Sequence, residues 1–238
     1  MKIYAHRGCS GSYPENTLLA FRAAAELPIT GVEFDVQLSK DGEIVVIHDT
    51  KVNRTTNGTG YVKDMTLDEL KDLDCGSWFS DEWRGEKIPT LDEVLDVFEE
   101  TDHILNIEVK SNVFPYDSLI DKMLGIIENR GFTRRIVISS FNHEDVLKVC
   151  RETSVKTAIL TDEIMVDIYD YARVIGTQRL HVSLAGAFRK MTSEALRRGS
   201  VVYVYTVNNF EYAEELMKTG VHGVFSDYPE LLMNRMSY

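Results

Sequence analysis

Short apolar segments recur along this chain, and most are separated by segments with helical periodicity. Residues 135–139 (Arg-Ile-Val-Ile-Ser) are typical, because they are rich in β-branched residues and apolar on both faces. Strands buried between two layers of a parallel sheet have this composition. The alternation predicts an α/β fold with a parallel sheet. The segments expected to be strands are 2–6, 31–38, 43–48, 104–109, 135–139, 156–160, 180–184, 201–206 and 222–226.

Helical patterns follow most of these strands. Segment 15–26 places Leu18, Phe21 and Ala25 on one stripe, and segment 116–129 has the same periodicity. An amphipathic helix covers a sheet with such a stripe. We therefore expect helices between most of the strands, as a repeated strand–helix unit requires.

The segment 43–48 is an exception, because the four residues 39–42 that separate it from strand 31–38 are too few for a crossover helix. Asp41-Gly42 between two apolar runs is typical of a hairpin with a two-residue turn. The segment is therefore expected to be an antiparallel return arm. In that register, Asp35 would lie directly opposite His48.

Eight parallel strands remain when the return arm is set aside, which is the number in a closed (β/α)8 TIM barrel. A doubly wound open sheet is the alternative, but residues 8–11 match its glycine-rich first turn poorly. Residues 51–88 lack strand–helix alternation, which indicates a small inserted subdomain after the hairpin that folds over the barrel rim. The pair Pro89-Thr90 then begins a helix. We expect one domain spanning residues 1–238.

Charge and composition narrow the classes of partner. The net charge of −12 argues against nucleic acid or an anionic membrane as the main partner. No apolar run is long enough to span a membrane, and no signal core precedes the first motif. A cytoplasmic location is therefore expected, with a leader removed before the first numbered residue as the alternative. The three cysteines share no ligand spacing and are expected to be reduced thiols. The oligomeric state is not indicated. An anionic substrate would need local positive charge.

Acidic residues occur where the barrel model places its active site, at the carboxyl ends of the strands. Alternation puts Glu33 and Asp35 on one strand face, and Glu108 follows on a neighbouring strand. Three crowded carboxylates would repel one another without a cation. Their hard oxygen atoms suit Mg²⁺ or Ca²⁺ rather than zinc. The sequence therefore predicts a divalent metal site.

Basic residues end the same strands. His6 and His48 are imidazoles that can act as a base and an acid at neutral pH. Arg7 and Lys110 add fixed positive charge for a phosphate group. Either histidine alone could be structural, and Glu108 with Lys110 could be a plain ion pair. Further polar residues at strand ends are Ser140, His181, Thr206 and Asp227, whereas His103, His143 and His222 are expected to be structural.

These residues fall within motifs that resemble the glycerophosphodiester phosphodiesterase family. The motifs follow the family order over essentially the whole chain. They are His6-Arg7-Gly8, Pro14-Glu15-Asn16-Thr17, Glu33-Phe34-Asp35-Val36, Lys40-Asp41-Gly42, His48-Asp49, Arg54-Thr55-Thr56-Asn57-Gly58, Ile88-Pro89-Thr90-Leu91, Glu108-Val109-Lys110, Ser139-Ser140-Phe141, Thr206-Val207-Asn208 and Ser226-Asp227-Tyr228-Pro229.

The resemblance implies metal-dependent hydrolysis of glycerophosphodiesters to glycerol 3-phosphate and an alcohol. It implies a catalytic pair of histidines, a metal held by three carboxylates, and phosphate contacts from Arg7 and Lys110. His6 and His48 match the catalytic pair of the family. The metal ligands are matched by Glu33, Asp35 and Glu108. The block around Asn16 is expected to shape a loop and start a helix, with Asn16 as a candidate cap.

One position departs from the family pattern. Tyr205 stands where the family commonly has tryptophan, so the packing of the glycerol end of the substrate is in question. The nucleophile could be water or the 2-hydroxyl of the substrate, and the preferred head group stays open. Two other functions compete with this one: a related phospholipase acting on lipid, and a catalytically silent module that senses phosphodiesters. The net charge of −12 and the full set of expected residues argue against them.

Overall fold

Eight parallel strands close into a barrel in the computed structural model of the chain, which describes residues 1–236. The barrel closes because β1 pairs with both β9 and β2, so the (β/α)8 prediction is confirmed. Its strands, in sequence order, are β1 (Lys2–His6), β2 (Gly31–Leu38), β4 (Ile104–Val109), β5 (Ile136–Ser140), β6 (Lys156–Thr161), β7 (Arg179–Ser183), β8 (Val201–Tyr205) and β9 (Gly223–Ser226).

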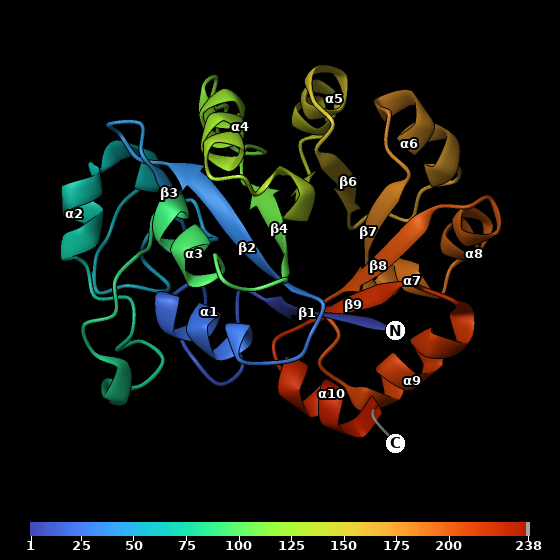
Figure 1. Cartoon of the computed structure of the whole chain (residues 1–238), viewed down its shortest axis with the longest axis horizontal. Coiled ribbons are helices and arrows are strands. Elements are labelled where there is room, and N and C mark those ends of the chain that lie inside the picture. The colour runs from blue at the N-terminus through green and yellow to red at the C-terminus, as the bar shows by residue number, and fades with distance from the viewer. Residues whose placement is uncertain (237–238) are drawn as a thin grey trace.

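The helices surround the strands in Figure 1, and their starts follow from capping residues. Thr17 accepts a hydrogen bond from the amide of Ala20 and begins α1, while Thr90 forms a capping box with Glu93 at the start of α3. Thr17, not the candidate Asn16, is therefore the cap of α1. The surrounding helices are α1 (Leu18–Ala25), α3 (Leu91–Val97), α4 (Leu119–Asn129), α5 (His143–Glu152), α6 (Ile168–Ile175), α7 (Leu184–Ala187), α8 (Lys190–Arg197), α9 (Phe210–Thr219) and α10 (Pro229–Met236).

The hairpin forms, but its predicted register is wrong by one residue. The strand β3 (Ile44–Val46) pairs antiparallel with β2, with Val36 opposite Val46. Asp35 therefore faces Ile47, whose amide donates to the Asp35 carbonyl at 3.0 Å, and not His48. The turn has three residues rather than two, because Gly42 adopts a positive φ of 83° that adds a residue to the loop.

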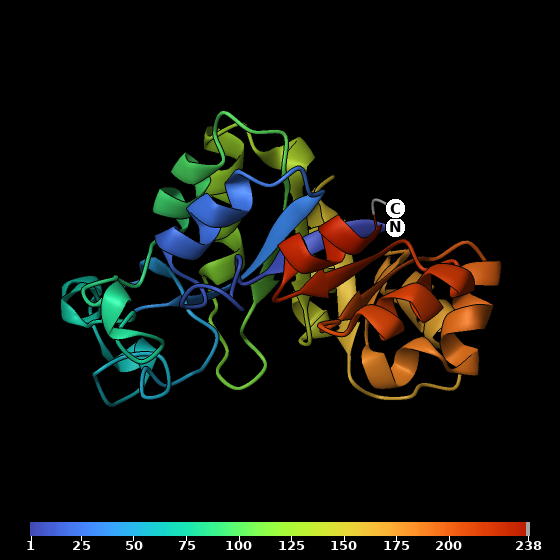
Figure 2. The same cartoon turned by 90° about the horizontal axis from the view of Figure 1, so that it is seen from below.

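Residues 51–88, between β3 and α3, contain no barrel strand. They hold the helix α2 (Leu67–Asp72) and two short 3₁₀ helices, η1 (Val62–Asp64) and η2 (Asp81–Trp83). The segment has its own apolar cluster, which also includes two residues of the hairpin arm. Its buried members are Val45, Ile47, Val52, Val62, Leu70, Cys75 and Ile88. Figure 2 shows this segment extending to one side of the barrel.

The hydrophobic core lies between the barrel and its helices, in two clusters. One joins β2, β4 and β5 to α1, α3 and α4, and the other joins β6 to β9 with the helices that follow them. The inside of the barrel holds a smaller aromatic cluster of Tyr4, Tyr203 and Phe225. Within residues 1–236, no helix has the length and apolar character needed to cross a membrane.

Candidate active site

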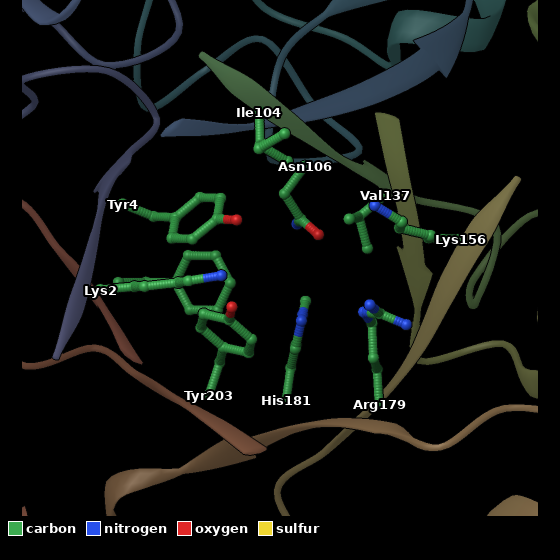
Figure 3. A pocket seen from close by; sticks show the side chains of 10 residues that line it. Lys2, Tyr4, Ile104, Asn106, Val137, Lys156, Arg179, His181 and Tyr203 are labelled. Atoms are coloured by element: carbon green, nitrogen blue, oxygen red, sulfur yellow. The ribbon is translucent and has the colours of Figure 1, made fainter. Parts of the chain in front are cut away.

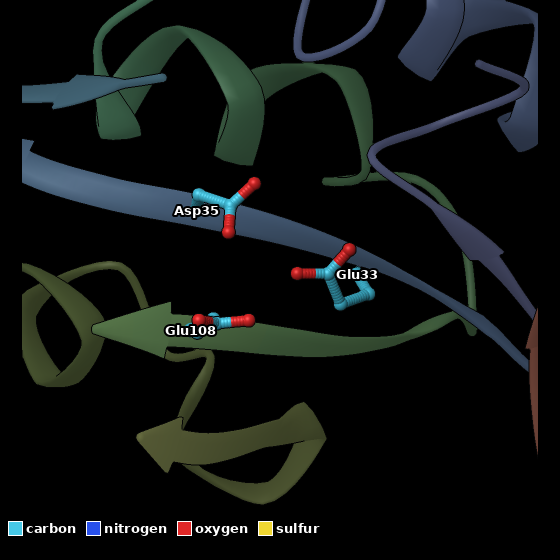
Figure 4. Close-up of side chains that lie close together, drawn as sticks. All are labelled: Glu33, Asp35 and Glu108. Atoms are coloured by element: carbon cyan, nitrogen blue, oxygen red, sulfur yellow. The ribbon is translucent and has the colours of Figure 1, made fainter. Parts of the chain in front are cut away.

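Three buried carboxylates meet at the carboxyl ends of two neighbouring strands. Glu33 and Asp35 project from β2 and Glu108 from β4, and the strand register pairs Asp35 with Glu108. One oxygen of each lies within 4.8 Å of the others, and the three side chains point toward one another (Figure 4). Less than a tenth of each residue is exposed. The period-two alternation of β2 therefore brings its two acids to one point, as the sequence indicated.

Burial and neighbouring charges shift the pKa values of these three acids. Burial and the neighbouring charges of Asp35 and Glu108 raise the pKa of Glu33 well above its ordinary value. Burial alone would also raise the pKa of Asp35, but Arg7, His48 and Lys110 hold it below its usual range. Glu33 Oε1 and Asp35 Oδ1 are buried, and neither has a hydrogen-bond partner among the residues that the structure describes. Unpartnered carboxylate oxygens in this geometry fit a hard divalent cation.

Arg7 lies among these acids. It adopts a positive φ of 56°, and its backbone amide donates to Glu33 Oε2 at 2.9 Å. Its guanidinium donates to Glu15 at 2.9 Å and lies 3.5 Å from Asp35 Oδ2. Asn16, also at a positive φ, donates to Asp35 Oδ2 at 2.8 Å. The loop after β1 therefore orients the carboxylates as well as supplying charge.

His6 ends β1 and is held by an aspartate at the far end of the chain. Its Nδ1 lies 2.6 Å from Oδ1 of Asp227, and its Nε2 lies 3.9 Å from Oε2 of Glu33. Asp227 in turn accepts hydrogen bonds from Ser10 at 3.0 Å and Asn208 at 2.6 Å. A fixed partner on one ring nitrogen leaves the other nitrogen facing the carboxylates.

His48 follows β3 in a bend that Gln37 maintains. The Gln37 amide donates to three consecutive carbonyls, those of Ile47, His48 and Asp49, at 3.0, 3.2 and 2.8 Å. The bend returns His48 to the site although the hairpin register does not place it opposite Asp35. Its Nδ1 lies 2.7 Å from Asp49 Oδ1. Burial, assisted by the positive charges of Arg7 and Lys110, lowers the pKa of His48.

Two further predicted residues line the site. The ammonium of Lys110 lies 2.7 Å from Glu108 Oε1 and 3.1 Å from His48 Nε2. Tyr205 borders a cavity of about 20 Å³ together with His6, Glu33 and Glu108. Its hydroxyl donates to Asp162 at 2.8 Å. All eight residues singled out in the sequence for the site therefore lie around one mouth of the barrel.

The other histidines have different surroundings. His103 contacts the Leu27 carbonyl, His143 contacts Tyr171, and His222 contacts the Val202 amide, away from the carboxylates. His181 lies in the middle of β7 rather than at its end, but it borders the same small cavity as Tyr205. Six residues that hold the site together had no predicted role in it, although Asp227 was noted as a polar residue at a strand end: Glu15, Asn16, Gln37, Asp49, Arg54 and Asp227. All but Gln37 lie within the motifs quoted above, which is the signal that could have identified them.

Comparisons with known proteins agree with this geometry. A model described as "Glycerophosphoryl diester phosphodiesterase family" matches residues 6–231. A glycerophosphodiester phosphodiesterase of Caldanaerobacter subterraneus is 40% identical over 235 residues, covering 98% of this chain and 96% of that protein. A phosphodiesterase of Oleispira antarctica, solved with the product sn-glycerol-3-phosphate, is 30% identical with a TM-score of 0.92, covering 100% of this chain and 97% of that one. The Thermotoga maritima glycerophosphodiester phosphodiesterase is 32% identical with a TM-score of 0.80, covering 98% and 97%.

Proposed function

The chain belongs to the glycerophosphoryl diester phosphodiesterase family, whose members are phosphoric diester hydrolases, and on that premise we propose that it hydrolyses glycerophosphodiesters to glycerol 3-phosphate and an alcohol by a metal-dependent reaction. The observation that carries this proposal is the meeting of three buried carboxylates with two carboxylate-held imidazoles at one mouth of the barrel. The Oleispira antarctica structure contains the product that we propose here.

Glu33, Asp35 and Glu108 would hold a divalent ion, either Mg²⁺ or Ca²⁺. When bound, such an ion neutralises the charge of the phosphate oxygens in the transition state. Lys110 is mostly buried and can supply a further positive charge to the phosphate. Arg7 acts chiefly through the carboxylates, because its guanidinium already contacts Glu15 and Asp35.

His48 is suited to be the general base. Its lowered pKa keeps the ring neutral at physiological pH. Asp49 accepts the Nδ1 proton, which leaves the lone pair on Nε2 directed toward Lys110 and the site. In the reaction, His48 takes the proton of the nucleophile, which is water or the 2-hydroxyl of the substrate.

His6 then supplies the proton that the departing alkoxide needs. The Asp227 carboxylate holds Nδ1 and fixes the orientation of the ring, so that Nε2 faces the site. Tyr205 borders the same cavity and can pack against the glycerol end of the substrate. A tyrosine in this place leaves more room than the tryptophan that is common in the family.

The experiment is a ³¹P NMR assay of glycerophosphocholine with the purified protein in Mg²⁺, in Ca²⁺ and in EDTA. Glycerol 3-phosphate should form with a metal and not in EDTA. An early cyclic glycerol phosphate signal would identify the 2-hydroxyl as the nucleophile. Faster cleavage of lysophospholipid than of glycerophosphocholine would instead favour a phospholipase that acts on lipid. No product after long incubation with either metal would contradict the proposal.

A further inference from the structure

A second pocket lies at the opposite mouth of the barrel from the carboxylates. It encloses about 110 Å³. Four of its residues, Lys2, Ile104, Lys156 and Arg179, are the first residues of β1, β4, β6 and β7. His6 and Glu108 of the active site lie toward the other ends of β1 and β4. Nothing in the proposed phosphodiester hydrolysis uses this pocket.

The pocket has a concentrated positive charge. Lys2, Lys156 and Arg179 line it, and none of its lining residues is acidic. Within residues 1–236, none of these three cations forms an ion pair. This opening therefore carries local positive charge, although the chain as a whole has a net charge of −12. Such a cluster attracts and holds an anion.

Buried polar side chains point into the same space. Asn106 and His181 are 2% and 3% exposed, and within residues 1–236 Asn106 Oδ1 and His181 Nδ1 have no hydrogen-bond partner. Figure 3 shows both side chains converging on the cavity with Tyr4 and Arg179. Because an unpartnered buried polar atom is costly, these atoms indicate a missing ligand. Asn106 is already fixed through its amide, which donates to Ser139 at 3.0 Å.

The chemistry of these atoms narrows the class of ligand. The cations require an anion, whereas the Asn106 oxygen can only accept a hydrogen bond. A single ligand satisfies both when it carries negative charge together with a hydroxyl. Hydrogen phosphate and singly protonated phosphomonoesters have this property, and sulfate does not. The volume of about 110 Å³ accommodates a tetrahedral oxyanion.

An aromatic floor separates this pocket from the catalytic mouth. The rings of Tyr4 and Tyr203 lie 5.4 Å apart, and the ring of His181 lies 4.8 Å from that of Phe225. Asn106, His181 and Phe225 also border the small cavity on the catalytic side. A single layer of side chains would therefore separate a ligand in the pocket at the opposite mouth from the catalytic side.

We propose that the mouth of the barrel opposite the carboxylates is a binding site for a protonated phosphate group, held by Arg179, Lys2 and Lys156 at its rim and by Asn106 and His181 inside. The phosphate group could come from free inorganic phosphate or from a small phosphomonoester such as glycerol 3-phosphate. None of these five residues is among the proposed metal ligands or the proposed catalytic histidines.

The test is a titration of the full-length protein in EDTA, at constant ionic strength, with inorganic phosphate, glycerol 3-phosphate and sulfate in separate arms. NMR of the Arg179 guanidinium, the His181 imidazole and the Asn106 side-chain amide reports the site, and Arg179 is the reporter that lines this pocket without bordering the cavity on the catalytic side. We expect saturable shifts of all three resonances with inorganic phosphate and weaker binding of sulfate. A saturable response to glycerol 3-phosphate identifies the phosphomonoester as a second source, and no response restricts the site to the free ion.

Two variants complete the test. Arg179→Met should weaken phosphate binding at least about tenfold, since a charge-assisted hydrogen bond contributes this much. Arg173→Met removes an exposed arginine elsewhere and is the matched control. Lys156→Gln should also weaken binding and replaces the first variant if that one fails to fold. Hydrolysis of glycerophosphocholine by these variants should match the parent protein, which separates this proposal from the proposed function.

Three results would overturn the proposal. One is that the shifts do not saturate by about 20 mM phosphate. A site with a Kd of about 1 mM, which corresponds to a binding free energy of only about 4 kcal/mol, would be saturated at that concentration. Another is unchanged affinity in both Arg179→Met and Lys156→Gln. The third is a set of shifts confined to residues at the catalytic mouth. Equal affinity for sulfate would contradict the role of the Asn106 oxygen.

Discussion

Nζ of Lys110 lies 3.1 Å from Nε2 of His48. An ammonium group only donates hydrogen bonds, so the imidazole nitrogen must carry a lone pair. The proton of the neutral ring is then on Nδ1, where the Asp49 carboxylate accepts it. The two neighbours of His48 thus select the tautomer and charge that a general base requires. His6 has an acidic partner, Asp227, at Nδ1 and is not in contact with an ammonium group within residues 1–236. This arrangement suits a general acid.

Removing either imidazole should remove a proton-transfer step. We expect His48→Ala and His6→Ala to lower kcat at least about 10²-fold each, the lower part of the range for acid–base groups. Steady-state assays with glycerophosphocholine check this. His143→Ala serves as a control, because that histidine contacts Tyr171 away from the site and should not affect kcat. Near-normal turnover in both site variants would exclude them from the mechanism.

Gln37 should matter for catalysis although it does not touch the carboxylates. Gln37→Leu leaves three carbonyls of the His48 bend without their donor. We expect a cost of about 1–3 kcal/mol in the free energy of unfolding, and a fall in kcat of roughly tenfold or more with a smaller change in KM. Tyr116→Phe is the control, since it removes only a 3.4 Å contact to the other side of the amide. Unchanged kcat in Gln37→Leu would show that the bend persists without the glutamine.

Metal removal should affect stability as well as activity. A cation at 100 times its Kd stabilises the folded state by about 2.7 kcal/mol, which corresponds to a Tm increase of about 5–10 °C for a chain of this size. We expect this increase when Mg²⁺ or Ca²⁺ is added to EDTA-treated protein, as followed by differential scanning calorimetry. The double variant Glu33→Gln, Glu108→Gln should not respond. An equal response in that variant would place the stabilising ion elsewhere.

His181 should make the protein less stable in acid. Burial lowers its pKa to about 3, whereas the unfolded chain has the ordinary value of about 6.5. Its contribution is therefore fully present above pH 6.5 and is lost as the pH falls toward 3. Between pH 7 and pH 5 the loss amounts to about 2 kcal/mol. Urea denaturation should show His181→Phe losing about that much less than the parent protein over the same interval, and equal losses would contradict the assignment.

The strands could be predicted from sequence because a buried strand has a local signature. The ranges expected for β1, β2 and β4 match the structure, and the others differ by one or two residues at their ends. The hairpin register could not be predicted from Asp41-Gly42 alone. That pair fits either a two-residue turn or a three-residue loop, and the φ of Gly42 decides between them.

The residues of the active site could be predicted from sequence more completely than the residues that hold them in place. Glu33, Asp35 and Glu108 could be grouped because strand alternation and parallel order bring them together. The link between His6 and Asp227 spans 221 positions and depends on the closure of the barrel. Asn16 resembled a helix cap, yet Thr17 takes that place and leaves the asparagine amide to Asp35. Contacts of this kind depend on tertiary structure and leave no local periodicity.

We propose that a divalent cation binds among Glu33, Asp35 and Glu108, with His6 and His48 on either side of it. The most direct measurement is anomalous diffraction from crystals of the protein grown with Mn²⁺ as a substitute ion. We predict one strong anomalous peak within bonding distance of oxygens from all three carboxylates. A peak of equal strength at another place, with none among these three side chains, would contradict the account.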